Sequence, residues 1–261
     1  MNIALFAPEE INLPLSNKDS RAKHILEILH KKEGDSFEAG IIGGNAGKAH
    51  ISKIDDVAIY FDFIPENDGI PLNSLKMIVG FPRPIQLKRL FRDMAGLGIC
   101  EIHLTGTELT EKSYLQSNIV EKGTAENLLI EGSVQAKSTH IPKLFLHTDV
   151  SQCLHFLHIH DEFFENCAKA TLDNVAPKHS LGQFMNHIIN DEHLHCVKDV
   201  SKNTKKCVYA AIGSERGWTN NERNLLKNAG FISCSIGNRI LRTESAATVA
   251  AAIILEKLGF I

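Results

Sequence analysis

Two short segments near the C-terminus have the residue types expected of loops that wrap around a small polar ligand. The first reads IGSERG over residues 212–217, and the second reads SIGNR over residues 235–239. Each follows an apolar run and precedes a helical pattern, so each is predicted to connect a strand to a helix. Glycine allows such a turn to be tight and its backbone to approach a ligand closely. Two ordinary strand–turn–helix junctions without a ligand would show the same glycines.

The full stretches around these turns are more specific than their glycines. Residues 212–231 read IGSERGWTNNERNLLKNAGF, and residues 235–251 read SIGNRILRTESAATVAA. They resemble the glycine-containing loop and the S-L-G-x-R-I-L-R-x-E-T-A signature of the RsmE family, the small-subunit (16S) ribosomal RNA uracil-N3 methyltransferases of the SPOUT superfamily. Nearer the N-terminus, KHILEILHKKEGDSFEAG over residues 23–40 is similar to a further segment of that family.

The resemblance implies a fold, a cofactor and an assembly. The implied fold is α/β, with a C-terminal SPOUT-type domain that has a parallel sheet and a trefoil knot, preceded by a small PUA-like β-barrel domain. The implied cofactor is S-adenosyl-L-methionine, bent into the knot, and the implied assembly is a homodimer whose interface helps to form the active site. The residues expected to bind the cofactor are Leu172, Gly213, Ser214, Glu215, Gly217, Ile236, Gly237, Ile240, Leu241 and Arg242. Apolar side chains and open backbone of this kind suit an adenine ring.

The implied reaction, methyl transfer to N3 of a uridine, sets its own chemical demands. N3 becomes nucleophilic only when its proton leaves, so the site needs a base or cations that stabilise the uracil anion. Arg239 and Arg242 are expected to hold uracil oxygens and phosphate, because guanidinium groups suit both. Glu244 is expected either to orient an arginine or to help remove the proton. Glu244 could equally be an ordinary carboxylate in the first turn of a helix, where the helix dipole stabilises its negative charge.

An RNA partner requires basic groups, and the chain has several local ones. The residues expected to contact small-subunit ribosomal RNA are Arg21, Lys23, Lys31, Arg83 and Arg216. Contacts from such residues to phosphate would position the RNA. Each basic stretch could equally be a helix face exposed to solvent, and Arg216 could simply point into solvent. Asp93 and Gly96 stand where the family has a lysine and a glutamate, and His30 stands where it has an arginine.

These departures leave other hypotheses open. A catalytically weak RNA-binding or ribosome-assembly factor on the same scaffold would keep the cofactor loops and lose the substrate chemistry. A methyltransferase with a shifted RNA target is a further alternative. A Rossmann-type nucleotide enzyme is disfavoured, because no GxGxxG motif follows the first strand and the glycine turns come late in the chain.

Histidines and cysteines gather in two places, which raises the question of a metal. One group is Cys153, His155, His158 and His160, and the other is His187, His193, His195 and Cys196. Neither has the Cys/His spacing of a familiar zinc site, so no metal site is expected and surface histidines are the simpler interpretation. The six cysteines form no CxxC pair and are interpreted as small buried residues in a reducing compartment, which predicts a cytoplasmic protein.

The elements that carry these residues fall into two predicted domains. The stretch PENDGIPLNS over residues 65–74 breaks helices and strands, so we expect a small β domain over residues 1–70, with one helix after Asp19-Ser20, and an α/β domain over residues 71–261. In the second domain, strands are expected over 75–80, 99–105, 143–147, 167–172, 206–212 and 231–236, and helices over 84–97, 114–135, 150–160, 220–228 and 243–258. This alternation predicts a parallel sheet, with ligands beyond the carboxyl ends of its strands.

Composition narrows the class of protein. Of 261 residues, 43% are hydrophobic and 23% are charged, which excludes a largely disordered chain. The formal net charge of −3 excludes a strong overall positive field, so RNA would have to meet a local basic patch. Apolar runs are shorter than the roughly 18 residues of a membrane-spanning helix, and the N-terminus lacks the basic start of a signal peptide, so no membrane partner is expected.

Overall fold

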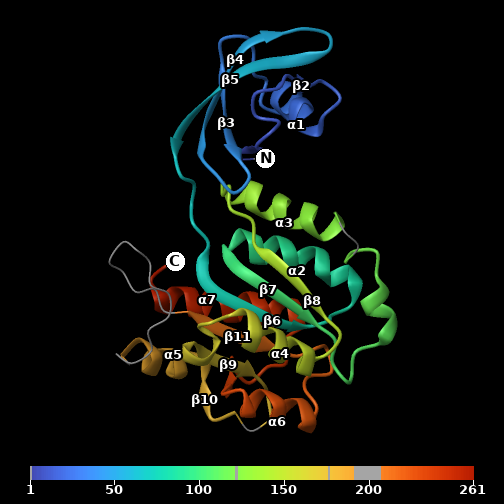
Figure 1. The fold of residues 1–261 in the computed structure, drawn as a ribbon, viewed down its shortest axis with the longest axis vertical. Helices are drawn as coiled ribbons and strands as arrows, with labels where there is room; N and C mark the ends of the chain where they lie inside the picture. The colour runs from blue at the N-terminus through green and yellow to red at the C-terminus, as the bar shows by residue number, and fades with distance from the viewer. Residues whose placement is uncertain (1, 121–122, 176, 191–206) are drawn as a thin grey trace. The chain divides into compact units, whose positions relative to one another are not determined.

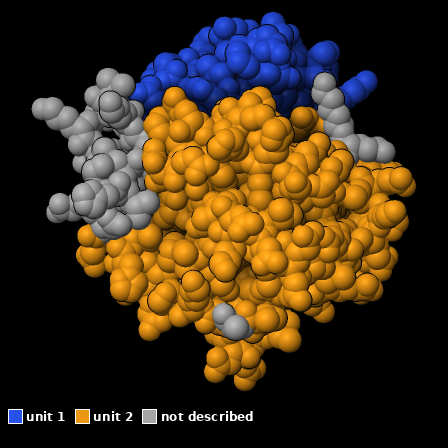
Figure 2. All heavy atoms as spheres, turned by 60° about the horizontal axis from the view of Figure 1, so that its bottom comes forward, with its two compact units in different colours: residues 1–72, 130–141 blue, residues 73–129, 142–261 orange. Residues whose placement is uncertain are grey.

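The structure, a computed structural model, describes residues 2–120, 123–175, 177–190 and 207–261. Contacts divide the chain into two compact units, which Figure 2 distinguishes by colour. The first contains residues 1–72 and 130–141, and the second contains residues 73–129 and 142–261. The first unit therefore consists of the N-terminal segment and one short segment, residues 130–141, that lies within the sequence of the second unit.

The first unit is built on a five-stranded sheet that curls around its own core. The strand order is β1 (Ala4–Phe6), β3 (Ser36–Ile41), β4 (Ala46–Ile54), β5 (Ala58–Asn67) and β2 (Leu15–Ser16). β1 and β3 are parallel, and the other neighbours are antiparallel. Shifts of register between β4 and β5 increase the local twist. Alternate residues of β4, such as Ala49 and Ile51, are fully buried, so one face of the sheet covers the core.

A helical segment packs against this curled sheet. It begins as α1 (Ser20–Lys23) and continues as one π-helical turn (His24–Ile28). Asp19 caps it as predicted, because its Oδ1 accepts a hydrogen bond of 2.8 Å from the backbone N–H of Arg21. Ala22 and Ile25 are fully buried among the apolar side chains of the strands.

The second unit contains a seven-stranded sheet in which all neighbouring strands are parallel. The strand order is β10 (His179–Ser180), β12 (Ile232–Ser235), β9 (Ala168–Leu172), β11 (Val208–Ile212), β6 (Asn73–Gly80), β7 (Ile99–Thr105) and β8 (Lys143–His147). Every residue of β9 and β11 is buried, as expected of strands covered on both faces. The predicted parallel sheet is confirmed.

Helices cover this sheet on both faces (Figure 1). On one face, α7 (Thr243–Leu258) contacts α2 (Pro84–Gly96) and α5 (Leu181–Asn190), while α4 (Val150–His160) and α6 (Asn220–Asn228) contact each other on the other face. Thr219 starts α6 with a capping box that it forms with Glu222. Among the described helices, none combines the length and the apolar character needed to cross a membrane.

The structure differs from the sequence prediction in two helical regions. In place of one helix over residues 114–135, it has a 3₁₀-helical turn (Lys112–Gln116) and a separate α3 (Thr124–Gln135). Gly123, directly before α3, has a φ of +95°, a non-helical conformation that glycine adopts readily. No helix is predicted for α5, although Leu181, Met185 and Ile188 repeat at helical spacing and are buried.

A buried ionic network links the sheet to the end of α4. The Lys76 ammonium on β6 donates to Oδ2 of Asp161 at 2.7 Å and lies 3.1 Å from Oε2 of Glu101. The Tyr209 hydroxyl also donates to Asp161. Burial alone would raise the pKa of Asp161, but the hydrogen bonds from Lys76 and Tyr209 outweigh it and lower this pKa below the usual 3.8. The carboxylate is therefore charged at neutral pH.

Asp161→Asn should lower the free energy of unfolding by about 3 kcal/mol at neutral pH, because it leaves the buried Lys76 ammonium without its nearest carboxylate. Since the pKa of Asp161 is lower in the folded than in the unfolded chain, this contribution is complete above about pH 4 and is lost as the pH falls through the folded-state pKa. Urea unfolding should therefore show a difference between wild type and variant that is constant above about pH 4 and shrinks as the pH falls below it. Asp56→Asn, at an exposed carboxylate, is the control. A difference independent of pH would contradict this account.

Candidate functional site

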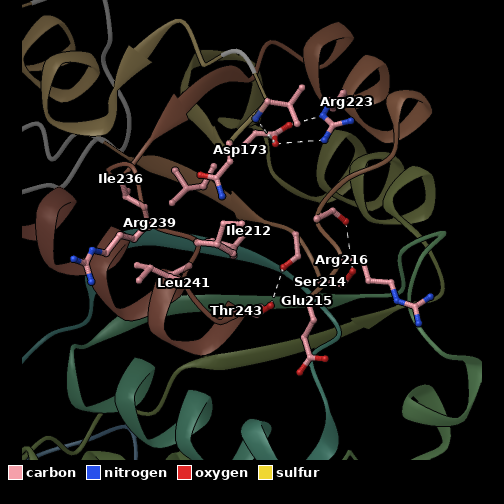
Figure 3. A pocket seen from close by; sticks show the side chains of 17 residues that line it. Asp173, Ile212, Ser214, Glu215, Arg216, Arg223, Ile236, Arg239, Leu241 and Thr243 are labelled. Carbon is pink, nitrogen blue, oxygen red and sulfur yellow. Dashed lines mark hydrogen bonds and ion pairs between the residues drawn. The ribbon is translucent and has the colours of Figure 1, made fainter.

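A pocket of about 250 Å³ lies at the carboxyl ends of three neighbouring strands of the second unit (Figure 3). Leu172 and Asp173 come from the end of β9, residues 212–217 come from the end of β11 and the loop after it, and Ile236 with residues 239–241 follows β12. Thr243, at the start of α7, also lines the pocket. Parallel sheets bind ligands at this edge, so the pocket occupies the position expected of a binding site.

Backbone packs so closely around the loop after β11 that neither Gly213 in the loop nor Gly80 at the end of β6 could carry a side chain. A Cβ on Gly213 would lie 2.9 Å from the carbonyl carbon of Gly217, and a Cβ on Gly80 would overlap the backbone nitrogen of Ser214. Gly217 has a φ of +73°, and its N–H donates to the Ser214 carbonyl at 2.8 Å, which closes the turn. The glycines therefore determine where this wall of the pocket lies.

Two hydroxyl groups fix the same loop to other elements. Thr243, buried in the first turn of α7, donates from Oγ1 to the carbonyl oxygen of Gly213 at 3.2 Å. Thr107, just after β7, donates to Oγ of Ser214 at 3.0 Å. The loop is thus held both by α7 and by the segment that follows β7.

An ion pair forms part of the pocket wall. Arg223 on α6 donates from Nε to Oδ2 of Asp173 at 2.5 Å, and its Nη2 lies 3.4 Å from Oδ1. The sequence predicts a loop after Leu172, but Asp173 and Arg223 were not among the predicted site residues. The available signal was the position of Asp173 directly after a buried apolar run, where a parallel strand reaches the ligand-binding edge.

Most residues predicted to bind a cofactor line this pocket. They are Leu172, Gly213, Ser214, Glu215, Gly217, Ile236, Ile240 and Leu241. Gly237 and Arg242 lie in the segment between β12 and α7 but are not among the lining residues. The two turns that are distant in the sequence therefore face one cavity.

The three residues predicted to act on a substrate lie near the start of α7. The exposed Arg239 lines the pocket, whereas Arg242, exposed at the N-cap of α7, does not line it. Glu244 is only 3% exposed, and its Oε2 has no hydrogen-bond partner among the described residues. A buried carboxylate oxygen without a partner is energetically costly, which distinguishes Glu244 from an ordinary solvated first-turn carboxylate.

A smaller recess of about 50 Å³ adjoins the pocket and shares Ser214, Glu215 and Arg216 with it. Arg83 lines this recess, with its Nε 3.1 Å from Oε2 of Glu215. Arg83 and Arg216, both predicted to contact RNA, are therefore brought together beside the pocket.

The other residues predicted to contact RNA belong to the first unit. Arg21 is engaged internally, because its guanidinium lies 3.0 Å from Glu10, 2.8 Å from Asp19 and over the ring of Phe6. Lys23 is exposed. Lys31 lines a hollow of about 290 Å³ together with Lys137, whose φ of +58° is uncommon for a residue other than glycine.

The histidine groups considered in the sequence do not converge within the described residues. On α4, Cys153 is buried, whereas His155, His158 and His160 are exposed. These three are surface histidines, as predicted. His187 is exposed, and His193, His195 and Cys196 lie outside the described residues.

A different pair of histidines is buried in the second unit. Nδ1 of His103 lies 3.1 Å from Nε2 of His147. Burial lowers the pKa of both imidazoles, that of His147 to about 4, so both rings are neutral at neutral pH. Sequence spacing could not reveal this pair, because the two residues belong to different strands.

Known proteins resemble this chain over nearly its whole length. Residues 70–255 match a family described as an RNA methyltransferase domain. The chain is 38% identical over 262 residues to the ribosomal RNA small subunit methyltransferase E of Treponema pallidum (strain Nichols), an alignment that covers 98% of this chain and 91% of the relative. It is 31% identical over 258 residues to the ribosomal RNA small subunit methyltransferase E 1 of Borreliella burgdorferi, covering 99% of both.

A solved structure has the same fold. It is the ribosomal RNA small subunit methyltransferase E from Neisseria gonorrhoeae bound to S-adenosyl methionine, with a TM-score of 0.67 and 17% sequence identity. The superposition covers 98% of this chain and 97% of that chain.

Thr243→Val should lower the free energy of unfolding by about 1–2 kcal/mol, because it leaves the buried carbonyl oxygen of Gly213 without its hydroxyl donor while the side chain keeps its shape. Urea unfolding of the full chain measures this effect. Stability unchanged within about 0.3 kcal/mol would contradict a role for this hydrogen bond in holding the loop.

Proposed function

Since this chain belongs to the RsmE family of RNA methyltransferases, we propose that it transfers a methyl group from S-adenosyl-L-methionine to N3 of a uridine in small-subunit ribosomal RNA. One observation carries the proposal. The pocket is lined by the two glycine turns on which the family signature falls, together with the end of β9. The relatives from Treponema and Borreliella are named for the same ribosomal RNA subunit.

The residues of the pocket fit this cofactor. Leu172, Ile236 and Leu241 provide apolar surface for an adenine ring, and the absence of a side chain at Gly213 lets the loop close tightly against Gly217 beside them. Asp173 and Glu215 add carboxylates to the lining, which suit the polar and positively charged parts of the molecule. When bound, S-adenosyl-L-methionine supplies an electrophilic methyl group on a sulfonium sulfur.

The target uridine makes separate demands on this chain. N3 must lose its proton before it attacks, so the negative charge that develops on the uracil must be stabilised. Arg239, exposed in the lining of the pocket, is proposed to donate to uracil oxygens, and the exposed Arg242 is proposed to hold a neighbouring phosphate. Glu244 is proposed to orient one of these arginines or to help remove the proton, and its unpartnered Oε2 supports such a role.

The proposal extends to the assembly and to the connection between β12 and α7. Ile240 is 85% exposed and Leu241 is 38% exposed, although both line the pocket. Apolar side chains at the mouth of a site favour a partner surface, and a second copy of this chain, as in a homodimer, would cover them. We also propose the trefoil knot in this region and a cytoplasmic location, where ribosomal RNA is found.

RNA is proposed to contact both parts of the chain. Arg83 and Arg216 lie beside the pocket, and Lys23 and Lys31 belong to the first unit, which we propose as a PUA-like RNA-docking domain over residues 1–70. Arg21, which was predicted to join them, already has carboxylate partners in Glu10 and Asp19, so its contribution is to hold the first unit together.

A catalytically weak RNA-binding or assembly factor is the second candidate, and the residues on α2 motivate it. Asp93, which stands where the family has a basic residue, lies 3.4 Å from Nε of Arg89 and accepts a hydrogen bond from Thr248 on α7 at 3.2 Å. This position is thus used to connect two helices of this chain, and it supplies no positive charge to RNA.

A methylation assay separates the two candidates. Small ribosomal subunits from cells that lack the protein are incubated with the purified chain and methyl-labelled S-adenosyl-L-methionine, and the modified nucleosides are mapped. The enzyme should label one uridine at N3. Cofactor binding without label in the RNA would favour the assembly factor, and label on another nucleotide would favour a shifted target.

Gly213→Val should weaken binding of S-adenosyl-L-methionine at least about 100-fold, which corresponds to about 2.7 kcal/mol, because the new side chain would displace the backbone at Gly217. Isothermal titration calorimetry measures the affinity. Gly96→Val is the matched control, since a Cβ at Gly96 meets nothing within 4 Å. Equal affinity of a folded Gly213→Val variant and the wild type would show that the pocket assignment is wrong.

A further inference from the structure

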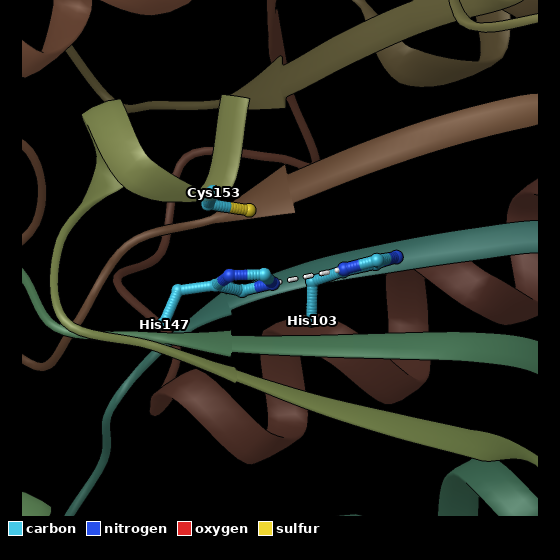
Figure 4. Close-up of side chains that lie close together, drawn as sticks. All are labelled: His103, His147 and Cys153. Carbon is cyan, nitrogen blue, oxygen red and sulfur yellow. Dashed lines mark hydrogen bonds between the residues drawn. The ribbon is translucent and has the colours of Figure 1, made fainter. Parts of the chain in front are cut away.

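Three buried side chains from separate elements meet on the α4 side of the sheet (Figure 4). They are His103 on β7, His147 on β8 and Cys153 on α4. Each offers one ligand atom, and the three atoms lie within 4.8 Å of one another. We propose that His103 Nδ1, His147 Nε2 and Cys153 Sγ bind a zinc ion.

The separation of the two nitrogens suits this ion. Zn–N bonds of about 2.0–2.1 Å at a tetrahedral angle place two nitrogen ligands roughly 3.4 Å apart. Nδ1 of His103 and Nε2 of His147 are 3.1 Å apart, so the nitrogens must separate by only about 0.3 Å, while both rings turn so that their lone pairs point at the ion and not at each other. The sulfur must approach by about 1 Å, because a Zn–S bond of about 2.3 Å places it roughly 3.6 Å from each nitrogen. In Figure 4 the Cys153 side chain points toward the two rings.

A carboxylate supports one of the ligands from behind. Oε2 of Glu101 lies 3.4 Å from Nε2 of His103, the ring nitrogen that faces away from His147. A proton shared with Glu101 at Nε2 leaves a lone pair on Nδ1 for the metal. Such carboxylate–histidine pairs orient zinc ligands in many sites and increase their basicity. Lys76 in turn pairs with Glu101 at 3.1 Å, which fixes the carboxylate.

The chemistry of the donors selects the metal. Two imidazole nitrogens and one thiolate are ligands that zinc accepts in tetrahedral geometry, whereas magnesium and calcium prefer oxygen ligands. When zinc binds, the Cys153 thiol loses its proton to solvent, and His147 exchanges the proton on Nε2 for one on Nδ1, so that Nε2 offers a lone pair. The sulfur then forms the Zn–S bond, and no oxidant or reductant is needed. Three protein ligands leave one tetrahedral position for water.

The proposed ion would connect the edge of the sheet to the helix above it. His103 and His147 belong to the neighbouring strands β7 and β8, and Cys153 belongs to α4, which packs on them. None of the three residues lines the pocket at β9, β11 and β12. The proposal is therefore independent of the proposed methyl transfer, and its effect is on the stability of this part of the second unit.

Metal content and affinity test the proposal directly. The full chain is stripped with a chelator and titrated with Zn²⁺ in competition with a chromophoric chelator, and thermal unfolding is followed in parallel. We expect one zinc per chain at this site and a melting temperature that rises on zinc addition. Glu101→Gln should weaken binding roughly 10–100-fold, the usual effect of losing such a supporting carboxylate.

Cys153→Ala and Cys167→Ala form the matched pair of variants, because both cysteines are buried in the same core cluster and only Cys153 faces the histidines. Zinc affinity should fall at least about 100-fold in Cys153→Ala and stay unchanged in Cys167→Ala, a difference of about 2.7 kcal/mol. Equal affinity in both variants, or no zinc bound by the wild type, would overturn the proposal.

Cobalt provides a second measurement that does not depend on the folding of a variant. The wild-type chain loaded with Co²⁺ should show a sulfur-to-cobalt charge-transfer band in the near ultraviolet. Tetrahedral cobalt without this band would mean that Cys153 is not a ligand. His103 and His147 would then be only a hydrogen-bonded pair.

Discussion

The close approach of backbone to backbone around Ser214 is the constraint on which the pocket depends. Gly80 at the end of β6 leaves room for the nitrogen of Ser214, and Gly213 leaves room for Gly217. The hydroxyl of Thr243 then fixes the carbonyl of Gly213 to the start of α7. Three segments far apart in the chain are thus held in close contact, and the packing of their backbones fixes the position of this wall of the cavity.

Carboxylates and guanidinium groups lie side by side around this wall. Asp173 and Glu215 contribute carboxylates to the pocket and Arg216, Arg223 and Arg239 contribute guanidinium groups, while Glu215 and Arg216 also line the recess with Arg83. Glu215 pairs with Arg83 at 3.1 Å, so the loop has both an acidic and a basic neighbour. A ligand at this loop would therefore meet groups of both signs, even though the net charge of the chain is slightly negative.

The sequence predicts the parts of this protein that depend on local signals. The alternation of apolar strands and capped helices predicts the parallel sheet, and the bounds of β7, β8, α4, α6 and α7 agree with it. The glycine turns predict tight connections between strand and helix, and the resemblance of the segments around them to the RsmE family implies many of the residues that line the pocket. Asp173 and Arg223 were missed, since an ion pair across 50 positions of sequence leaves no local pattern. The same limit explains why His103, His147 and Cys153 were not grouped, since they come from three separate elements, whereas the histidines of α4 that are close in sequence are exposed.

The order of strands in the second unit has a consequence for how the chain is made. β11, at residues 208–212, pairs with β6 on one side and β9 on the other, so this central strand leaves the ribosome after both of its neighbours. Until then the apolar strand β6 has an open edge, where unsatisfied N–H and C=O groups could pair with another nascent chain. To reach its native topology, the protein must therefore insert β11 between β6 and β9 after both have been made, and forming contacts between such distant parts of a chain is intrinsically slow. Its partly synthesised form is the state in which chaperones would matter most.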